Sequence, residues 1–371
     1  MSRARTLALL LTLGVSVACG LPPIQVPTAM VDPSCEPSCL FKHEVEPGGA
    51  GDRLRFVALG DAGKPGDAES VQGRVASRVR EVCAAGFGDP ATPACAFSLL
   101  VGDNLYPAGI GNDDDRRKLA AIIESYGLPA YLVLGNHDWG PVRPTIGRAR
   151  QELAWIYETE NVYGNAHFYD FRAGPAHLWA IDTNYLVRRK EAAAELAPSE
   201  WVQAIGQTAA RWRIAVGHHP YLSNGSHGNA GSYRDLRIVN WRGREFKTFF
   251  DDYVLGNVDL YLAGHDHNLQ FYSRAATGDA PGPGLVVAGS ASKCKGTGRA
   301  ENGKSAGTVM PAFEFYGPGF AVVDVTADRL TVELHRPDDR NRWDVWVATI
   351  VRGGQWTHDP ASSDLSDHCG L

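Results

Sequence analysis

The sequence predicts an α/β protein folded as a four-layer αββα sandwich, in which two mixed β-sheets pack face to face and helices cover their outer faces. Two observations predict this fold. From residue 53 onward, short apolar runs alternate with helical patterns, which is typical of βαβ units. Beyond residue 285, apolar runs follow one another without a helical pattern between them, so we expect a second sheet built largely of antiparallel strands.

The expected strands are apolar runs of strand length bounded by turn residues. Five of these runs end in a glycine that is soon followed by polar side chains, and they cover residues 55–59, 97–101, 130–134, 212–216 and 258–263. Further strands are expected at residues 178–181, 285–288, 321–325, 330–334 and 345–351. The glycine-ended runs are the most informative feature of the chain, because polar groups are costly at the ends of buried strands.

Helices are expected where apolar residues recur at helical spacing. Residues 68–82 carry valines at positions 71, 75, 79 and 82, which lie on one face of a helix. Residues 117–126 and 148–157 have the same character. No repeat and no transmembrane segment is visible in the sequence.

The first 18 residues have the pattern of an export signal. Arg3 and Arg5 form a positive region, residues 7–17 are too short an apolar stretch to span a membrane, and residues 16–18 form a small-residue cleavage site. Cys19 follows directly, as in bacterial lipoproteins whose cysteine is acylated after cleavage. We favour this membrane-anchored form, and a periplasmic or secreted protein is the alternative.

The remaining chain divides into a tether, a main domain and a tail. Residues 19–52 are rich in proline, glycine and acidic residues without apolar periodicity, which indicates a tether. Residues 53–352 form the expected main domain, and residues 353–371 are interpreted as a C-terminal tail. Two loops, at residues 222–234 and 289–307, are where we expect specificity for a substrate to arise.

Composition narrows the class of protein. A hydrophobic content of 44% and a charged content of 21% are ordinary for a soluble globular protein. A net charge of −6 argues against a nucleic-acid partner bound by charge neutralisation. Of the seven cysteines, six remain when Cys19 is set aside, and an even number in an exported protein favours disulfide bonds. Cys83 with Cys95 is the pairing that we expect first.

Each glycine-ended run is followed by side chains that can bind a metal. Because the unpaired burial of such groups is costly, we expect the five strand ends to converge on a metal site. Two adjacent metal ions would supply a nucleophile, neutralise phosphate oxygens and stabilise a leaving alkoxide. The candidate side chains lie at residues 61, 103–106, 136–138, 218–219 and 265–267.

In order and spacing these clusters resemble the purple acid phosphatases of the small, tartrate-resistant type, within the calcineurin-like metallophosphoesterase superfamily. The family motifs D-x-G, G-D-x-x-Y, G-N-H-[D/E], a strand-ending histidine and G-H-x-H match residues 61–63, 102–106, 135–138, 217–218 and 264–267. The resemblance spans residues 53 to about 335. It implies the metallophosphoesterase fold and an acid phosphatase that cleaves phosphate monoesters by attack of a metal-bound hydroxide.

The resemblance also implies two unequal metal sites that share one bridging carboxylate. The first site would hold Fe(III), because a phenolate is a hard anionic donor that suits a trivalent ion. The ligands of this first site would be Asp61, Asp103, Tyr106 and His267. The second site would hold Fe(II), Zn(II) or Mn(II), and its ligands would be Asp103, Asn136, His218 and His265.

The remaining polar residues of the motifs receive other roles. Of the adjacent pair His218 and His219, the resemblance makes His218 the ligand, because Pro220 stands two residues after it, and His219 becomes its neighbour. His137 would contact the phosphoryl group, and His227 is the candidate general acid. Asp138 is expected to orient His137 through a hydrogen bond.

Three functions remain open on the sequence alone. The first is an exported dimetal acid phosphatase acting on small phosphorylated substrates. The second is a phosphodiesterase or nucleotidase of the same superfamily, which generally lacks the tyrosine ligand. The third is a surface binding protein that retains a structural metal site. The sequence leaves the physiological substrate, the second metal and the oligomeric state undetermined.

Overall fold

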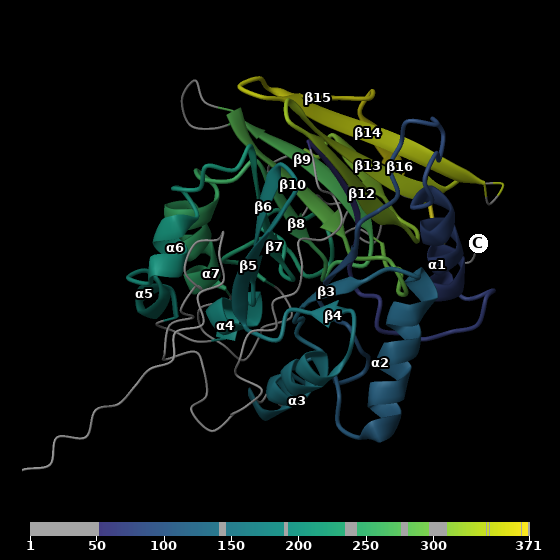
Figure 1. The fold of residues 1–371 in the computed structure, drawn as a ribbon, viewed down its shortest axis with the longest axis horizontal. Coiled ribbons are helices and arrows are strands. Elements are labelled where there is room, and N and C mark those ends of the chain that lie inside the picture. Colours follow the sequence, from purple (N-terminus) through teal and green to yellow (C-terminus); the bar gives the residue numbers. More distant parts are fainter. Residues whose placement is uncertain are drawn as a thin grey trace, which may run out of the picture.

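The computed structural model describes residues 52–140, 146–188, 192–233, 243–275, 281–296, 310–338, 340, 342–364 and 366–369. Two eight-stranded sheets pack face to face, and helices lie on either side of them at the left and right of Figure 1. The predicted α/β sandwich of two mixed sheets with outer helices is therefore confirmed. The expected signal peptide and tether, with Cys19, lie outside the described residues.

The first sheet has the strand order β15-β14-β13-β12-β1-β2-β3-β4. Strands β1 to β4 run parallel, whereas β12 to β15 are joined to β1 and to one another by antiparallel pairing. The strands are β1 (Arg53–Leu59), β2 (Ser98–Val101), β3 (Ala130–Val133), β4 (Val162–Tyr163), β12 (Phe320–Thr326), β13 (Arg329–Pro337), β14 (Trp343–Val351) and β15 (Trp356–His358).

The second sheet has the order β16-β11-β9-β10-β8-β7-β6-β5. Strands β6, β7, β8 and β10 are parallel, and β5 and β9 pair antiparallel with their neighbours. The strands are β5 (Phe168–Ala173), β6 (Ala176–Ile181), β7 (Trp212–Gly217), β8 (Leu260–Ala263), β9 (Leu269–Ala275), β10 (Pro281–Ala288), β11 (Phe313–Phe315) and β16 (Ser362–Asp364).

The late strands do not form a separate, largely antiparallel sheet, so that prediction was wrong. Strand β12 pairs with β1, in a register that joins Val57 to Val322, and therefore extends the first sheet. The second sheet is centred instead on its own parallel strands. The apolar runs indicate strands correctly, but nothing within a run specifies which distant edge it will pair with.

The helices are α1 (Val71–Val82), α2 (Asp113–Tyr126), α3 (Ile146–Glu158), α4 (Thr183–Arg188), α5 (Ala192–Leu196), α6 (Glu200–Ala204) and α7 (Arg244–Phe249), which a π-helical turn, η1 (Phe250–Val254), continues. Local sequence accounts for the ends of α2. The Asn112 side chain accepts the N–H groups of Asp114 and Asp115, and Gly127 ends the helix in a left-handed conformation with φ of 69°. Among the described residues, no helix combines the length and apolar character needed to cross a bilayer.

The core consists of layers defined by the alternation of strand side chains. In β1, Leu54, Phe56 and Ala58 point into the space between the sheets, whereas Val57 and Leu59 pack with the outer helices. Phe56 stacks on Phe97 between the sheets, with ring centroids 5.0 Å apart. Since the strands are covered on both faces, their backbones hold the polar residues at their ends in rigid positions.

Two disulfide bonds join distant segments of the described chain. Cys83 pairs with Cys95, as predicted, and ties the end of α1 to the segment before β2. Cys294 pairs with Cys369, which fastens the end of the chain to the loop after β10. Residues 353–371, interpreted from sequence as a tail, contribute β15 to the first sheet and β16 to the second.

Candidate metal centre

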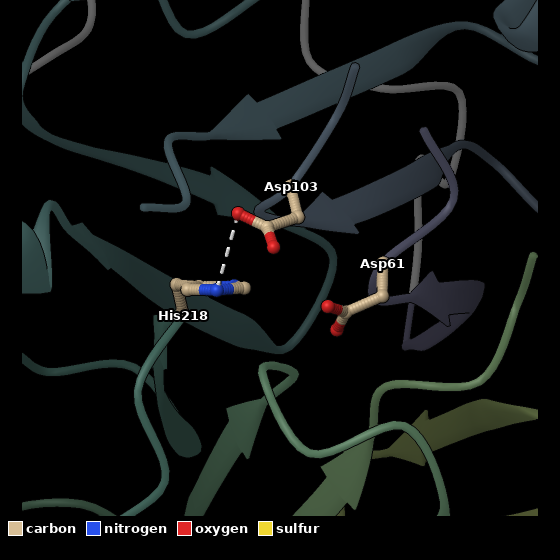
Figure 2. Close-up of side chains that lie close together, drawn as sticks. All are labelled: Asp61, Asp103 and His218. Atoms are coloured by element: carbon tan, nitrogen blue, oxygen red, sulfur yellow. Dashed lines mark ion pairs between the residues drawn. The ribbon is translucent and has the colours of Figure 1, made fainter. Parts of the chain in front are cut away.

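Five parallel strands end in one region of the molecule. β1, β2 and β3 of the first sheet lead to Asp61, Asp103 and Asn136, while β7 and β8 of the second lead to His218 and to the two histidines at 265 and 267. The side chains of Asp61, Asp103 and His218 point toward one another (Figure 2), with their ligand atoms within 4.8 Å. This location agrees with the general rule that α/β proteins bind ligands at the carboxyl ends of their strands.

The turns that follow the strands are strained in a consistent way. Asp61, Asp103 and His265 adopt left-handed backbone conformations, with φ of 56°, 55° and 70°. Such conformations cost a non-glycine residue about 1–3 kcal/mol each and are concentrated at functional sites. In this protein the left-handed conformations turn the three side chains toward one shared centre. The strained residues are therefore the ones that bring the candidate ligands together.

Two glycines at strand ends are required by close approach. A Cβ on Gly102 would lie 2.5 Å from Nδ1 of His218, and one on Gly135 would lie 2.1 Å from the backbone nitrogen of Asp103. Neither contact leaves room for a side chain. This crowding explains the glycine before these two polar clusters: Gly102 meets a histidine from the second sheet, and Gly135 meets the neighbouring strand end of its own sheet.

The Tyr106 hydroxyl lies at the centre of a first cluster of donor atoms. It is 2.7 Å from Oδ1 of Asp61, 2.9 Å from Oδ2 of Asp103 and 3.3 Å from Nε2 of His267. The hydroxyl has one proton and can donate to only one of these three atoms. The other lone pairs of these atoms face one another without a proton between them, and a cation bound at this point would satisfy them.

The second cluster surrounds Nε2 of His218. Nδ1 of this histidine is 3.0 Å from the carbonyl oxygen of Val101, which can only accept, so Nδ1 carries the proton and Nε2 presents a lone pair. That lone pair faces Oδ1 of Asn136 at 3.1 Å, Nδ1 of His265 at 3.2 Å and Oδ1 of Asp103 at 3.3 Å. All of these atoms are of types that bind metal ions, and they lie within 3.3 Å of Nε2 of His218, so the donor set fits a metal.

Asp103 connects the two clusters, because its oxygens face different ways. Oδ1 faces His218, and Oδ2 faces the Tyr106 hydroxyl. The carboxylate of Asp103 is almost fully buried, at 2% exposure. Its position between the clusters is that of a bridging ligand for two metals.

The ionisable groups of the first cluster shift the pKa values of one another. Burial opposes ionisation of Asp61, but His267, His218 and the Tyr106 hydroxyl outweigh it and lower the pKa of Asp61 well below its usual range. Burial, together with Asp103 and Asp61, raises the pKa of Tyr106 well above its usual value. Ionisation of this phenol therefore requires a compensating positive charge close by, which a metal ion would supply.

His137 stands beside the centre and is oriented by the backbone. Its Nδ1 is 2.5 Å from the carbonyl oxygen of Pro107, and its backbone N–H donates to Oδ1 of Asp103 at 2.8 Å. Nε2 lies 3.9 Å from Oδ2 of Asp103, and the ring packs edge-on against Tyr106. Since Nδ1 must donate to the carbonyl, Nε2 is the nitrogen left to act at the centre.

Asp138 does not orient His137 as expected. Its carboxylate lies behind the turn and accepts backbone N–H groups from Gly135 at 2.7 Å, Asn104 at 3.1 Å and Leu105 at 3.2 Å. Burial and the neighbouring carboxylates, Glu152 first, raise the pKa of Asp138 well above its usual value. The residue holds the loops after β2 and β3 together, and the Pro107 carbonyl takes the role that sequence reasoning gave to Asp138.

His227 reaches the centre on the loop that follows β7. Its ring lies 4.3 Å from the ring of His265 and 6.0 Å from that of His267. The loop is held by Asp266, whose carboxylate accepts the N–H of His227 at 3.0 Å and the Ser223 hydroxyl at 2.5 Å. Sequence reasoning missed Asp266, although its place inside the G-H-x-H motif was a usable signal.

The ring of His219 packs against the ring of His265, with centroids 4.5 Å apart. Its Nδ1 is 2.8 Å from the hydroxyl of Thr183, which also accepts the N–H groups of His218 and His219. Thr183 thus positions the histidine pair. No sequence motif marked Thr183, because it approaches from a different strand end, after β6.

Residues 54–269 match the calcineurin-like phosphoesterase family. The chain is 25% identical to purple acid phosphatase 4 of Arabidopsis thaliana, over 67% of this chain and 73% of that protein. It is 24% identical to human (Homo sapiens) tartrate-resistant acid phosphatase type 5, over 76% of this chain and 87% of that protein. Its fold is similar to the solved structure of PhoD, with a TM-score of 0.56 and 11% identity over 86% of this chain and 74% of that one.

Proposed function

Because the chain belongs to the calcineurin-like phosphoesterase family, we propose that it is an exported dimetal acid phosphatase that hydrolyses small phosphate monoesters. The observation that carries this proposal is the position of Tyr106. Its hydroxyl lies 2.7 Å from Asp61 and 2.9 Å from Asp103, at the centre of the first donor cluster. The similarity to purple and tartrate-resistant acid phosphatases supports the same activity.

The two donor clusters correspond to two metal ions of different character. The cluster containing the phenol would hold Fe(III) through Asp61, Asp103, Tyr106 and His267, since hard anionic donors suit a trivalent ion. The other cluster would hold Fe(II), Zn(II) or Mn(II) through Asp103, Asn136, His218 and His265. When bound, the two ions supply Lewis acidity that lowers the pKa of water and neutralises phosphoryl charge.

Two histidines of this chain would act on the substrate directly. His137 has its Nδ1 proton committed to the Pro107 carbonyl, so a protonated His137 would donate from Nε2 to a phosphoryl oxygen. His227 would protonate the leaving alkoxide, a step that typically contributes about 10²–10⁴-fold to rate. Both rings are partly exposed, as groups that meet a substrate must be.

The proposal is tested with a generic aryl phosphate, assayed from acidic to neutral pH on metal-loaded protein. We expect turnover by the wild type and a loss of about 10²–10³-fold in His137→Ala, because a donor to developing charge is removed. His358→Ala is the matched control, since His358 is exposed on β15, and its activity should be unchanged. A fully metal-loaded wild type without turnover would favour the surface binding protein.

The same assay separates the alternatives within the superfamily. A phosphatase cleaves the aryl monoester much faster than the corresponding diester or a nucleotide diester bond. Faster cleavage of the diester would replace the monoesterase proposal with the phosphodiesterase, and a strong preference for a nucleoside monophosphate over the aryl monoester would indicate the nucleotidase. Tyr106 favours the monoesterase, because the phosphodiesterases and nucleotidases of the superfamily generally lack this tyrosine ligand.

Export is supported by the two disulfide bonds, which persist in oxidising compartments. Anchoring through a lipidated Cys19 is the form that we propose, and mass spectrometry of the mature N-terminus tests it. A mature chain that begins with unmodified Cys19 would leave a periplasmic or secreted enzyme.

A further inference from the structure

Lys293 lies beside the metal centre on a segment that is fastened at three points. The Ser292 hydroxyl donates to the backbone oxygen of Asp61 at 2.5 Å. The N–H of Lys295 donates to the backbone oxygen of His267 at 2.8 Å. Cys294 is joined to Cys369 by the second disulfide bond. The lysine therefore stands on backbone that is tied to two of the candidate ligands.

The ammonium group itself is placed over the tyrosine of the first cluster. Nζ of Lys293 lies 3.6 Å from the centroid of the Tyr106 ring, which is a cation–π contact. The side chain is partly buried, whereas Lys64 and Lys295 nearby are exposed. Among the described residues, Nζ of Lys293 forms no ion pair with a carboxylate. A partly desolvated charge without an ion-pair partner is costly, so its position requires an explanation.

Negative charge at the centre provides part of that explanation. The carboxylates of Asp61 and Asp103 interact favourably with the ammonium of Lys293 through their charges. With cations bound, these two carboxylates would be neutralised as ligands and would no longer balance the ammonium. The lysine would then face an excess of positive charge, unless an anion enters the site.

We propose that Lys293 is a phosphoryl-binding residue, whose ammonium donates a hydrogen bond to a nonbridging oxygen of the bound phosphate on the Tyr106 side of the centre. This inference rests on the proposed phosphatase function. It adds a third donor to the two histidines. A lysine suits the role because its ammonium is a compact charge on a flexible stem that can follow the phosphate during turnover.

The test compares Lys293→Met, which retains most of the stem and removes the charge, with Lys293→Arg, which retains the charge. Lys295→Met is the matched control, because it removes an exposed charge two residues away. Inorganic phosphate is titrated calorimetrically into each metal-loaded protein, and KM, kcat and inhibition by phosphate are measured with an aryl phosphate. Metal content and thermal unfolding establish that each variant is folded and loaded.

We expect Lys293→Met to weaken phosphate binding about tenfold and to raise KM by a similar factor, with a smaller change in kcat. Lys293→Arg should recover most of the affinity, and Lys295→Met should resemble the wild type. Wild-type phosphate affinity and KM in Lys293→Met would overturn the proposal, as would an equal loss in Lys295→Met. Failure of the phosphatase function itself would be recognised separately, as absent turnover in a wild type whose phosphate binding is still measurable.

Discussion

The carboxylate of Asp266 accepts the backbone N–H of His227 at 3.0 Å, and so joins the loop after β7 to the loop after β8. The contact places the proposed general acid beside the ring of His265, 4.3 Å away. There is no room for a side chain at Gly225, where a Cβ would lie 1.9 Å from the Asp266 carboxyl carbon. Asp266 is therefore a positioning residue for His227.

Asp266→Ala should impair protonation of the leaving group more than metal binding. We expect kcat to fall about 10- to 100-fold for an alkyl phosphate, whose leaving group needs a proton, and much less for a nitrophenyl phosphate, whose leaving group does not. Asp266→Asn, which retains an acceptor oxygen, should recover part of the loss. Asp113→Ala, at an exposed site on α2, is the control. Equal losses on both substrates would indicate damage to the centre instead.

Tyr106→Phe tests the identity of the first metal. If Tyr106 binds Fe(III) as a phenolate, the purified wild-type protein should have a visible tyrosinate-to-iron charge-transfer band, and the variant should lack it. The phenol needs such a cation to ionise, because burial and the nearby carboxylates raise its pKa. Iron analysis accompanies the spectra. An active, colourless and iron-free wild type would contradict the assignment of iron.

A partly buried ion pair between Arg55 on β1 and Glu333 on β13 should make stability depend on acid pH. Burial opposes ionisation of Glu333, but hydrogen bonds from His335 and Arg55 outweigh it and lower the pKa of Glu333 to about 2. This value lies below the unfolded pKa of 4.5. The ion pair therefore stabilises the fold fully at pH values above the pKa of Glu333 in the unfolded chain. This stabilisation is lost as the pH falls toward the pKa of Glu333 in the folded protein.

The pKa difference of about 2.5 units, from 4.5 to about 2, corresponds to a lost stabilisation of about 3–4 kcal/mol, at about 1.4 kcal/mol for each pKa unit. Glu333→Gln should reduce the free energy of unfolding at neutral pH and flatten its decline between about pH 5 and pH 2. Denaturant unfolding at several pH values measures both effects. Glu124→Gln, an exposed residue on α2, should leave the pH profile unchanged. An unaltered profile in Glu333→Gln would show that other groups control acid sensitivity.

Removal of the Cys83–Cys95 bond should affect stability and spare activity. The bond closes a loop of 12 residues at the end of α1, away from the metal centre. In the chain-entropy account, loss of a bond that closes a loop of this size lowers the free energy of unfolding by about 3 kcal/mol. Cys83→Ser with Cys95→Ser should thus lower the unfolding temperature, with kcat unchanged at a temperature where the variant is folded. A large fall in kcat of the folded variant would connect this bond to the site.

Sequence reasoning succeeded where the information is local. Periodicity of apolar residues indicated α1, α2 and α3 and the strands that end at the centre, because side-chain alternation is a property of neighbouring residues. It failed on the late strands, since β12 pairs with β1 across more than half of the chain. It also gave Asp138 the wrong partner, because the distance from His137 to the Pro107 carbonyl depends on how two loops meet.

The sequence alone specifies which candidate donor side chains follow the strand ends, in what order, and after which glycines. A motif encodes these features because they depend on residue type and short spacing. Only the tertiary structure decided how the donors face each other. The Val101 carbonyl selects the proton position on His218, Thr183 and Asp266 hold the histidine loops, and the Ser292–Lys295 segment places Lys293 over Tyr106. Those contacts join residues that are distant in the chain, and packing of the two sheets brings them together.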